Sequence, residues 1–296
     1  MGDRLQGTEP GRSGPMHPAM ASIRRTKERF PELFPFDAAR TFADPETRKR
    51  ADSAVGCVLN FEGASVDVGL GPVDWSGAHV KHQEWPAQLN RFYLLWTLTP
   101  AYAVTGDERY AQSARRYMED WIDHHPPYAP AGPKMPGDSS LNMTMRLGYW
   151  LGFLDHYEGA RAFDDAFVDK ILACVDWQLE WLVHNVALGG NWRINGFHGL
   201  LQAGLYLPER WRRYLEIGRD ELITEFHSQF LPDGGHVERS AGYGDWMVSI
   251  FTTFDLIGRR LQPNGWELDA DKLLKAQFHM LAHLKPNGER CHFNDS

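Results

Sequence analysis

The sequence is poor in cysteine, has no excess of positive charge and contains no long apolar run. Its three cysteines, Cys57, Cys174 and Cys291, lie far apart and form no C-x-x-C pair, so we expect free thiols and neither a disulfide framework nor a zinc knuckle. Lys and Arg number 31 against 39 Asp and Glu, and this net charge of -8 excludes a global positive field for nucleic acid or an anionic membrane. A polyanion would need a local basic cleft.

The two ends of the sequence lack regular patterns. Residues 1–20 are rich in Gly, Pro and charge, and no run apolar enough for a signal peptide or a membrane span follows them. We expect a disordered leader there and, by default, a cytoplasmic location, which would become periplasmic if the natural start differs. Turn-forming residues at 286–296 indicate the entry to a further element.

Helical periodicity fills the chain from residue 84 onward. Helices are predicted over residues 86–104, 140–157, 164–186, 199–207, 210–230, 243–261 and 271–284. A further helix, capped by Thr105 or Asp107, carries a buried stripe of Tyr110, Ala114, Tyr117, Met118 and Trp121. The short connections favour antiparallel hairpins and predict an all-α fold, an α/α barrel or an α-solenoid. The lack of a fixed-period repeat argues against the common solenoids.

Eleven tryptophans are many for 296 residues. Aromatic rings in a groove can stack on the C–H faces of pyranose rings while polar neighbours bind the hydroxyls. Four tryptophans beside loops or polar clusters are candidates for this role: Trp75, Trp85, Trp192 and Trp246. For each of them, the hydrophobic core is the alternative place.

Two clusters combine tight turns with polar side chains at predicted helix starts. In residues 189–209, a Gly-Gly pair precedes Asn191, Arg193, Asn195 and His198; in residues 229–247, a Pro-Asp-Gly-Gly turn precedes His236, Glu238, Arg239, Ser240 and Tyr243. Loops at helix ends carry function on many helical scaffolds.

Three runs in this order, NRFYLLWTLTPAYAVTGDERYA, NW…GLLQAGLYLPE and QFLPDGGHVERSAGY, resemble the α-helical domain of heparinase II/III-like polysaccharide lyases and the related alginate lyases. The resemblance covers most of residues 70–296. It implies an incomplete (α/α) toroid over residues 21–285, with residues 286–296 opening a β-sandwich region. It also implies cleavage of a uronate-containing acidic polysaccharide by β-elimination. That step needs no metal, and no cofactor is predicted. His79 and His82 form an i, i+3 pair, but no third ligand with a recognisable spacing accompanies them, so no zinc site is predicted.

The resemblance assigns the catalytic asparagine to Asn191 and the catalytic tyrosine to Tyr243. An amide donor can stabilise the charge that builds on the uronate carboxylate when the C5 proton leaves, and a phenol can move the proton. Arg239, four residues before Tyr243, could lower the pKa of the phenol if both lie on one helix. A further catalytic histidine usually comes from the β-sandwich region, and His198 is a candidate second proton-transfer group here.

The remaining candidates would bind the substrate. Arg91, Arg146, Arg193 and Arg239 could line a positive cleft, with buried or surface ion pairs as the alternative. The predicted substrate-binding set is Arg91, Arg146, Trp192, Arg193, Asn195, His236, Glu238, Arg239 and Trp246.

Two other functions stay open at this stage. One is an α/α-barrel glycoside hydrolase that uses Asp233 and Glu238 as its carboxylate pair, although both also suit a turn and a helix start. The other is a non-catalytic glycan-binding fragment. The sequence does not identify the polysaccharide or the oligomeric state.

Overall fold

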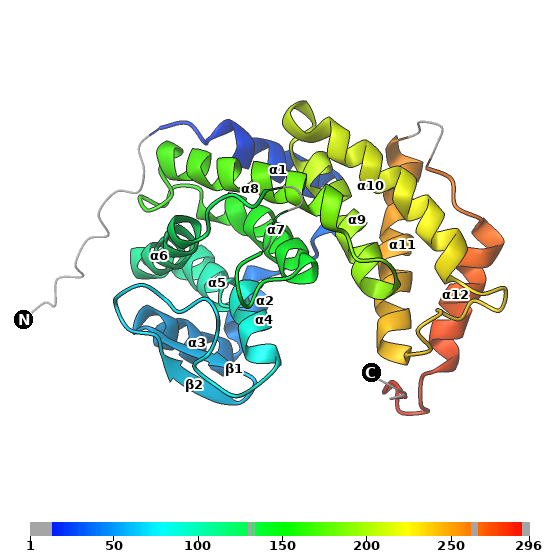
Figure 1. Ribbon diagram of the computed structural model, residues 1–296, viewed down its shortest axis with the longest axis horizontal. Helices are drawn as coiled ribbons and strands as arrows, with labels where there is room; N and C mark the ends of the chain where they lie inside the picture. Colours follow the sequence, from blue (N-terminus) through cyan, green and yellow to red (C-terminus); the bar gives the residue numbers. More distant parts are fainter. Residues whose placement is uncertain (1–13, 130–131, 133, 262–265, 292–296) are drawn as a thin grey trace, which may run out of the picture.

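The computed structural model describes residues 14–129, 132, 134–261 and 266–291. These residues form helices almost throughout, in an arc that begins near α3 and ends at α12 (Figure 1). The helices are α1 (Pro18–Arg29), α2 (Ala38–Ala43), α3 (Pro45–Val55), α4 (Glu84–Asn90), α5 (Leu95–Thr105), α6 (Glu108–His124), α7 (Ser140–Leu154), α8 (Asp165–Asn185), α9 (Gly190–Tyr206), α10 (Pro208–Gln229), α11 (Ala241–Leu261) and α12 (Ala270–Ala282). Two 3-10 turns, η1 (Pro31–Leu33) and η2 (Asp155–Tyr157), accompany them.

Most of the predicted helices are confirmed, and their ends have local causes. Asp107 caps α6 by accepting a hydrogen bond from the Arg109 backbone N–H. The predicted stripe of α6, from Tyr110 to Trp121, is buried. The helix predicted over residues 86–104 is instead two helices, since Phe92 has a φ of 63° and stacks on Trp75 between them.

Helices that follow one another in the sequence pack together, as α5 does with α6, α9 with α10, and α11 with α12. The contact between α9 and α10 is the most extensive, because two glycines let the backbones approach closely. A Cβ on Gly204 would lie 2.5 Å from the Leu215 side chain, and one on Gly218 would lie 2.6 Å from the Phe197 carbonyl. This contact fixes the start of α9 relative to the end of α10.

Three features depart from the sequence analysis. Helix α1 begins at Pro18, and Ala19 and Met20 are buried, so the predicted leader cannot extend to residue 20. Helices α1 to α3 arise from a stretch for which no element was predicted. An antiparallel hairpin, β1 (Val58–Phe61) and β2 (Ala64–Asp67), was also missed. Residues 1–13 and 292–296, parts of the predicted leader and β region, lie outside the described residues.

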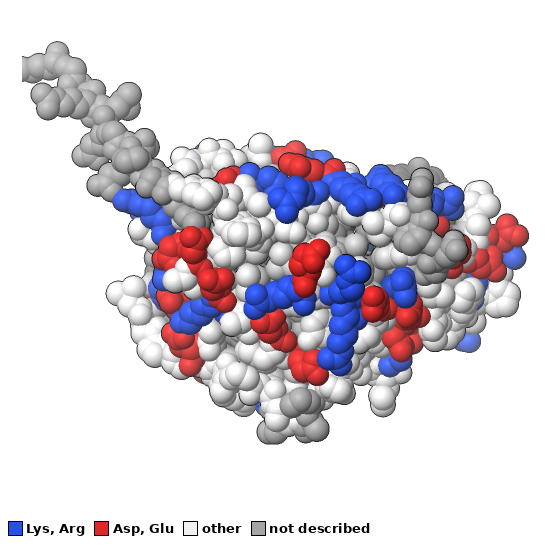
Figure 2. Space-filling model, turned by 90° about the horizontal axis from the view of Figure 1, so that it is seen from above, with Lys and Arg blue, Asp and Glu red and all other residues white. Residues whose placement is uncertain are grey.

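Charges of both signs are mixed on the outer surface. Figure 2 shows Lys and Arg side chains interspersed with Asp and Glu on the face seen from above. Pairs such as Arg210 with Asp176, at 2.5 Å, and Arg213 with Glu180, at 3.0 Å, join α10 to α8. Within the described part of the chain, no helix is long and apolar enough to cross a membrane.

Three buried histidines should make the fold less stable in acid. Burial lowers the pKa of His125, His156 and His198 to about 4 in each case, whereas an unfolded histidine has a pKa of about 6.5. Between these values the unfolded chain binds more protons than the folded chain, so the free energy of unfolding should fall as the pH falls through this window. Urea unfolding at about pH 7 and about pH 5 measures the effect, and His125→Gln should reduce it. If the free energy of unfolding fell equally with pH in the parent and in His125→Gln, His125 would not contribute to the loss of stability.

Candidate active site

The two predicted motif clusters meet at a contact between Asn191 and Glu238. Asn191 lies in the first turn of α9 and is 4% exposed. Its backbone N–H donates to Glu238 Oε1 at 3.0 Å, and its side-chain Nδ2 lies 3.1 Å from Oε1 and 3.0 Å from Oε2. A side chain at the preceding Gly190, whose φ is 68°, would collide with the same carboxylate. The two segments are therefore adjacent in the fold.

This contact leaves one N–H of the Asn191 amide available. Seen from Nδ2, the two oxygens of one carboxylate lie in nearly the same direction, whereas the two N–H bonds of an amide diverge by about 120°. A single N–H can therefore serve both Glu238 oxygens. The second N–H meets no acceptor among the described residues. Asn191 is thus a fixed amide with a donor to spare.

A chain of polar side chains extends from Glu238 to the end of α10. The Glu238 backbone N–H donates to His236 Nδ1 at 3.4 Å, and His236 Nε2 lies 3.1 Å from Gln229 Oε1. Gln229 donates to Glu225 at 2.6 Å, and Glu225 pairs with Arg193 at 2.5 Å. Burial lowers the pKa of His236, so the neutral ring with its proton on Nε2 satisfies both contacts. The network ties α9, α10 and the 230–240 loop together.

Tyr243 lies in the first turn of α11, three residues after the Ser240 hydroxyl that accepts its backbone N–H at 3.1 Å. Its side chain is half-buried. Arg239 is exposed and has a φ of 55°, so it precedes α11 instead of sharing a helical face with Tyr243. Since α11 begins at Ala241, the condition that both residues lie on one helix is not met, and the effect of Arg239 on the pKa of the phenol stays a prediction.

His198 and Asn195 follow Asn191 on α9. The spacing of seven residues places His198 on the same helical face as Asn191, about 10 Å further along the axis. The lowered pKa of His198, about 4, keeps its ring neutral near pH 7. Asn195 is 3% exposed and donates to the Asn191 carbonyl at 2.8 Å, so its amide is used within the helix. Substrate binding by Asn195 is not consistent with this burial.

Among the arginines predicted for a positive cleft, Arg91, Arg146 and Arg193 have carboxylate partners. Arg146 is completely buried; it pairs with Asp138 at 3.1 Å and lies over the Trp121 ring at 4.0 Å. It cannot contact a substrate, so this prediction is wrong, and the alternative of a buried ion pair is confirmed.

The other arginines differ in exposure. Arg193 pairs with two carboxylates of α10, and its guanidinium lies 4.7 Å from the Phe197 ring centroid. Arg91 is held by Asn142 at 2.8 Å and by Glu84 at 3.2 Å. Arg239 alone of the four is exposed.

The remaining candidates divide by burial. Trp192 is 43% exposed and Trp246 is half-buried, whereas Trp75 and Trp85 lie in the core. The side chain of His236 is 1% exposed, so it acts on Glu238 and Gln229, not on solvent. Glu238 holds Asn191, and Asp233 accepts a hydrogen bond from the Gly235 backbone N–H at 2.9 Å. Both members of the predicted hydrolase pair therefore have structural partners.

A cavity of about 370 Å³ lies beside Arg239, between the 230–241 segment, the start of α11 and α12. His279 of α12 and His283, the residue directly after that helix, line it with their rings 4.5 Å apart, and so does Asp245. Burial raises the pKa of Asp245, which pairs with Arg290 at 2.7 Å. Sequence reasoning missed these residues, although the spacing of four between the two histidines places them on one helical face. No group of three potential ligands suited to a metal ion occurs among the described residues.

Comparisons with known proteins identify the family and the fold. The family model described as heparinase II/III N-terminus matches residues 17–296. The chain is 28% identical to a heparin-sulfate lyase of Bacteroides thetaiotaomicron over 171 residues, which cover 57% of this chain and 24% of that protein. It is also 28% identical to a heparin-sulfate lyase of Pedobacter heparinus over 224 residues, covering 70% of this chain and 32% of that protein. The chain spans about a quarter to a third of these relatives.

Solved structures support the fold. The crystal structure of a heparan sulfate lyase from Pedobacter heparinus matches 93% of this chain and 45% of its own chain, with a TM-score of 0.72 and 23% identity. A crystal structure of heparinase III matches 94% of this chain and 47% of its own, with a TM-score of 0.74 and 21% identity. The predicted all-α toroid is confirmed. Because the family model covers almost the whole sequence, the chain belongs to the heparinase II/III family, of which it carries the N-terminal helical region.

Proposed function

We propose that this chain is the helical part of a polysaccharide lyase that cleaves a uronate-containing polysaccharide by β-elimination. The observation that carries the proposal is the Asn191 amide, oriented by Glu238 and left with one unused donor. The relatives named heparin-sulfate lyase support the same reaction class and favour a glycosaminoglycan as the substrate.

The fixed amide suits the difficult step of this reaction. Removal of the C5 proton pushes negative charge onto the adjacent uronate carboxylate, and a preorganised donor stabilises that charge without having to reorient. The free N–H of Asn191 is such a donor. The Glu238 carboxylate is occupied by the backbone and side-chain N–H groups of Asn191, which offset its own charge.

Tyr243 would move the proton. Its phenol can take the C5 proton as the base, or donate to the departing O4 as the acid, once a substrate lies between α9 and α11. A further proton-transfer group would come from the region that this chain does not share with its longer relatives. His198, on the Asn191 face of α9, is the candidate within the chain.

The test is a panel of uronate polysaccharides, sulfated glucuronan and alginate among them, followed by ultraviolet absorbance. Elimination leaves a C4–C5 double bond that absorbs, and hydrolysis does not. The panel should be run on this chain and on a version extended beyond Ser296. Absorbing products from either protein would support the proposal. Reducing ends without absorbance would favour hydrolysis, and oligosaccharide binding without products from either version would favour a glycan-binding fragment.

Glu238 acts in this proposal as a positioning residue. Glu238→Gln should lower kcat about tenfold, because an amide in its place presents a single acceptor to Asn191 and removes the charged hydrogen bond. KM should change little, and the thermal midpoint should fall only slightly. Asp233→Asn, in the same loop, is the control and should keep normal turnover, since Asn can accept the Gly235 N–H. An unchanged kcat in Glu238→Gln would show that Glu238 does not orient Asn191 for catalysis.

A further inference from the structure

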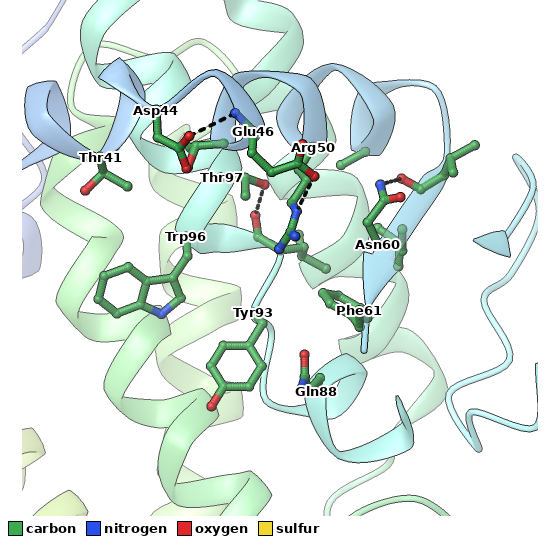
Figure 3. Close-up of a pocket in the computed structure, with 15 residues that line it drawn as sticks. Thr41, Asp44, Glu46, Arg50, Asn60, Phe61, Gln88, Tyr93, Trp96 and Thr97 are labelled. Atoms are coloured by element: carbon green, nitrogen blue, oxygen red, sulfur yellow. Dashed lines mark hydrogen bonds and ion pairs between the residues drawn. The ribbon is translucent and has the colours of Figure 1, made fainter. Parts of the chain in front are cut away.

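Two adjoining cavities lie on the N-terminal part of the fold. The first, about 400 Å³, is bounded by α2, α3, β1, α4 and α5 (Figure 3). The second, about 820 Å³, lies between α1, η1, α2 and η2. Thr41 and Trp96 line both, so the cavities meet at these residues. We call the two cavities together the aromatic trough. None of their lining residues comes from α9 to α12 or from the segments that hold Asn191 and Tyr243.

Half-buried aromatic rings follow one another along the trough. Tyr93 and Trp96 line the first cavity, and Phe34 and Phe36 line the second beyond Trp96. The Trp96 ring lies 5.6 Å from Phe36 in an edge-on contact and 6.0 Å from Phe34 in a stacked one. This mutual packing holds the rings in place before any ligand arrives, which lowers the entropic cost of binding.

Polar side chains surround these rings in the first cavity. In Figure 3, Gln88 and Tyr93 lie on one side of the cavity, and Arg50 extends toward it from α3. The Arg50 Nε donates to Glu46 at 3.0 Å, and Asn60 lies on the neighbouring strand. Amide, phenol and guanidinium groups beside aromatic faces suit a pyranose, whose C–H faces stack while its hydroxyls donate and accept.

The charges of the trough are nearly balanced. The first cavity has the carboxylates of Asp44 and Glu46 against the guanidinium of Arg50. The second has three cations and three carboxylates: Arg24, Lys27, Arg40, Glu28, Asp37 and Asp155. The Lys27 ammonium and the Asp155 carboxylate form a 2.7 Å pair. A trough without excess positive charge does not attract a sulfated chain, but it can hold an uncharged one.

We propose that the aromatic trough is a saccharide-binding site, separate from the candidate active site, that takes a neutral stretch of a pyranose chain. The sugar rings stack on Tyr93, Trp96 and Phe36 in succession, and the hydroxyls bond to Gln88, Asn60 and Arg50. Because stacking and hydrogen bonds to uncharged sugar hydroxyls carry the binding, the affinity changes little with salt.

The test measures binding of cellotetraose and of the β-1,4-linked tetramer of N-acetylglucosamine to the 296-residue chain by NMR titration. At least one neutral tetrasaccharide should bind with a dissociation constant below about 10 mM, with equal affinity at low and high salt. Tyr93→Ala and Gln88→Ala should each weaken binding about fivefold or more. The matched control is Phe278→Ala, which removes a 62% exposed aromatic on α12 and should leave binding unchanged.

Circular dichroism of each variant checks that the fold is intact, and Gln88→Ala, at a half-buried polar position, keeps the test valid if Tyr93→Ala unfolds. Failure of both neutral probes to bind would overturn the proposal. So would equal binding by the Gln88, Tyr93 and Phe278 variants, or binding seen only with a sulfated heparin tetrasaccharide and lost at high salt. None of these results depends on lyase activity, so failure here leaves the proposed function standing.

Discussion

Tyr243→Phe should lower turnover of a uronate polysaccharide about a hundredfold or more while substrate binding is largely kept. The substitution removes the phenolic proton carrier and retains the ring that is half-buried at the start of α11. The measurement is the initial rate of ultraviolet absorbance, in the shortest version of the protein that is active, with KM determined in parallel.

The matched control for this change is Tyr214→Phe. The Tyr214 hydroxyl donates to Glu180 at 3.0 Å across the α8–α10 contact, away from α11, so its loss should leave turnover unchanged. If Tyr243→Phe kept a near-normal rate, the phenol could be neither the acid nor the base. The proton transfer would then pass to His198, and His198→Gln should abolish activity.

Asp138→Asn should destabilise the fold by about 3–5 kcal/mol, because it leaves the guanidinium of Arg146 buried without its counter-charge. The side chains of Arg146 and Asp138 are 0% and 1% exposed, so neither contacts solvent. Gln178 and the Asn90 carbonyl accept its other hydrogen bonds, at 2.9 and 2.8 Å, but neither supplies a negative charge. Chemical denaturation measures this loss in the free energy of unfolding. The dependence of that free energy on denaturant concentration should be the same in both proteins, so that the midpoints can be compared.

An exposed pair of the same kind provides the control. Asp107→Asn breaks the 2.7 Å pair with Arg109 but keeps a residue that caps α6. Since solvent weakens exposed ion pairs, this variant should unfold at nearly the same denaturant concentration as the parent. Comparable losses in the two variants would mean that burial does not set the strength of the Arg146 pair.

The helical part of the fold was predictable because the periodicity and the caps agree. The buried stripe on α6 and the Asp107 cap at its start independently predict the same helix. The split at Phe92 was not predictable, since it depends on stacking against Trp75, seventeen positions earlier in the chain. The hairpin was missed although Gly63, with a φ of 73°, supplies its turn, because each strand has only four residues and too few alternations to distinguish it from a loop.

The candidate site was predictable in its members more than in their roles. Spacing and turn chemistry located the segments of Asn191 and Glu238, but they could not show that the two side chains bind each other across 47 positions. Arg146 illustrates the same limit. A guanidinium in an apolar helix implies either a partner or a cleft, and the partner, Asp138, lies in a loop whose course the sequence does not define.

The polar network around Asn191 also has a consequence for the order of folding. Its members come from the first turn of α9, the last two turns of α10 and the loop before α11, so the amide gains its orientation only after all three have docked. Contacts within a helix pair are local in the sequence, so we expect them to form early, and we expect this junction of three segments to form after them. A protease cut in the exposed part of the loop, near Leu231 and Pro232, would therefore disorganise the site while leaving the helical arc assembled.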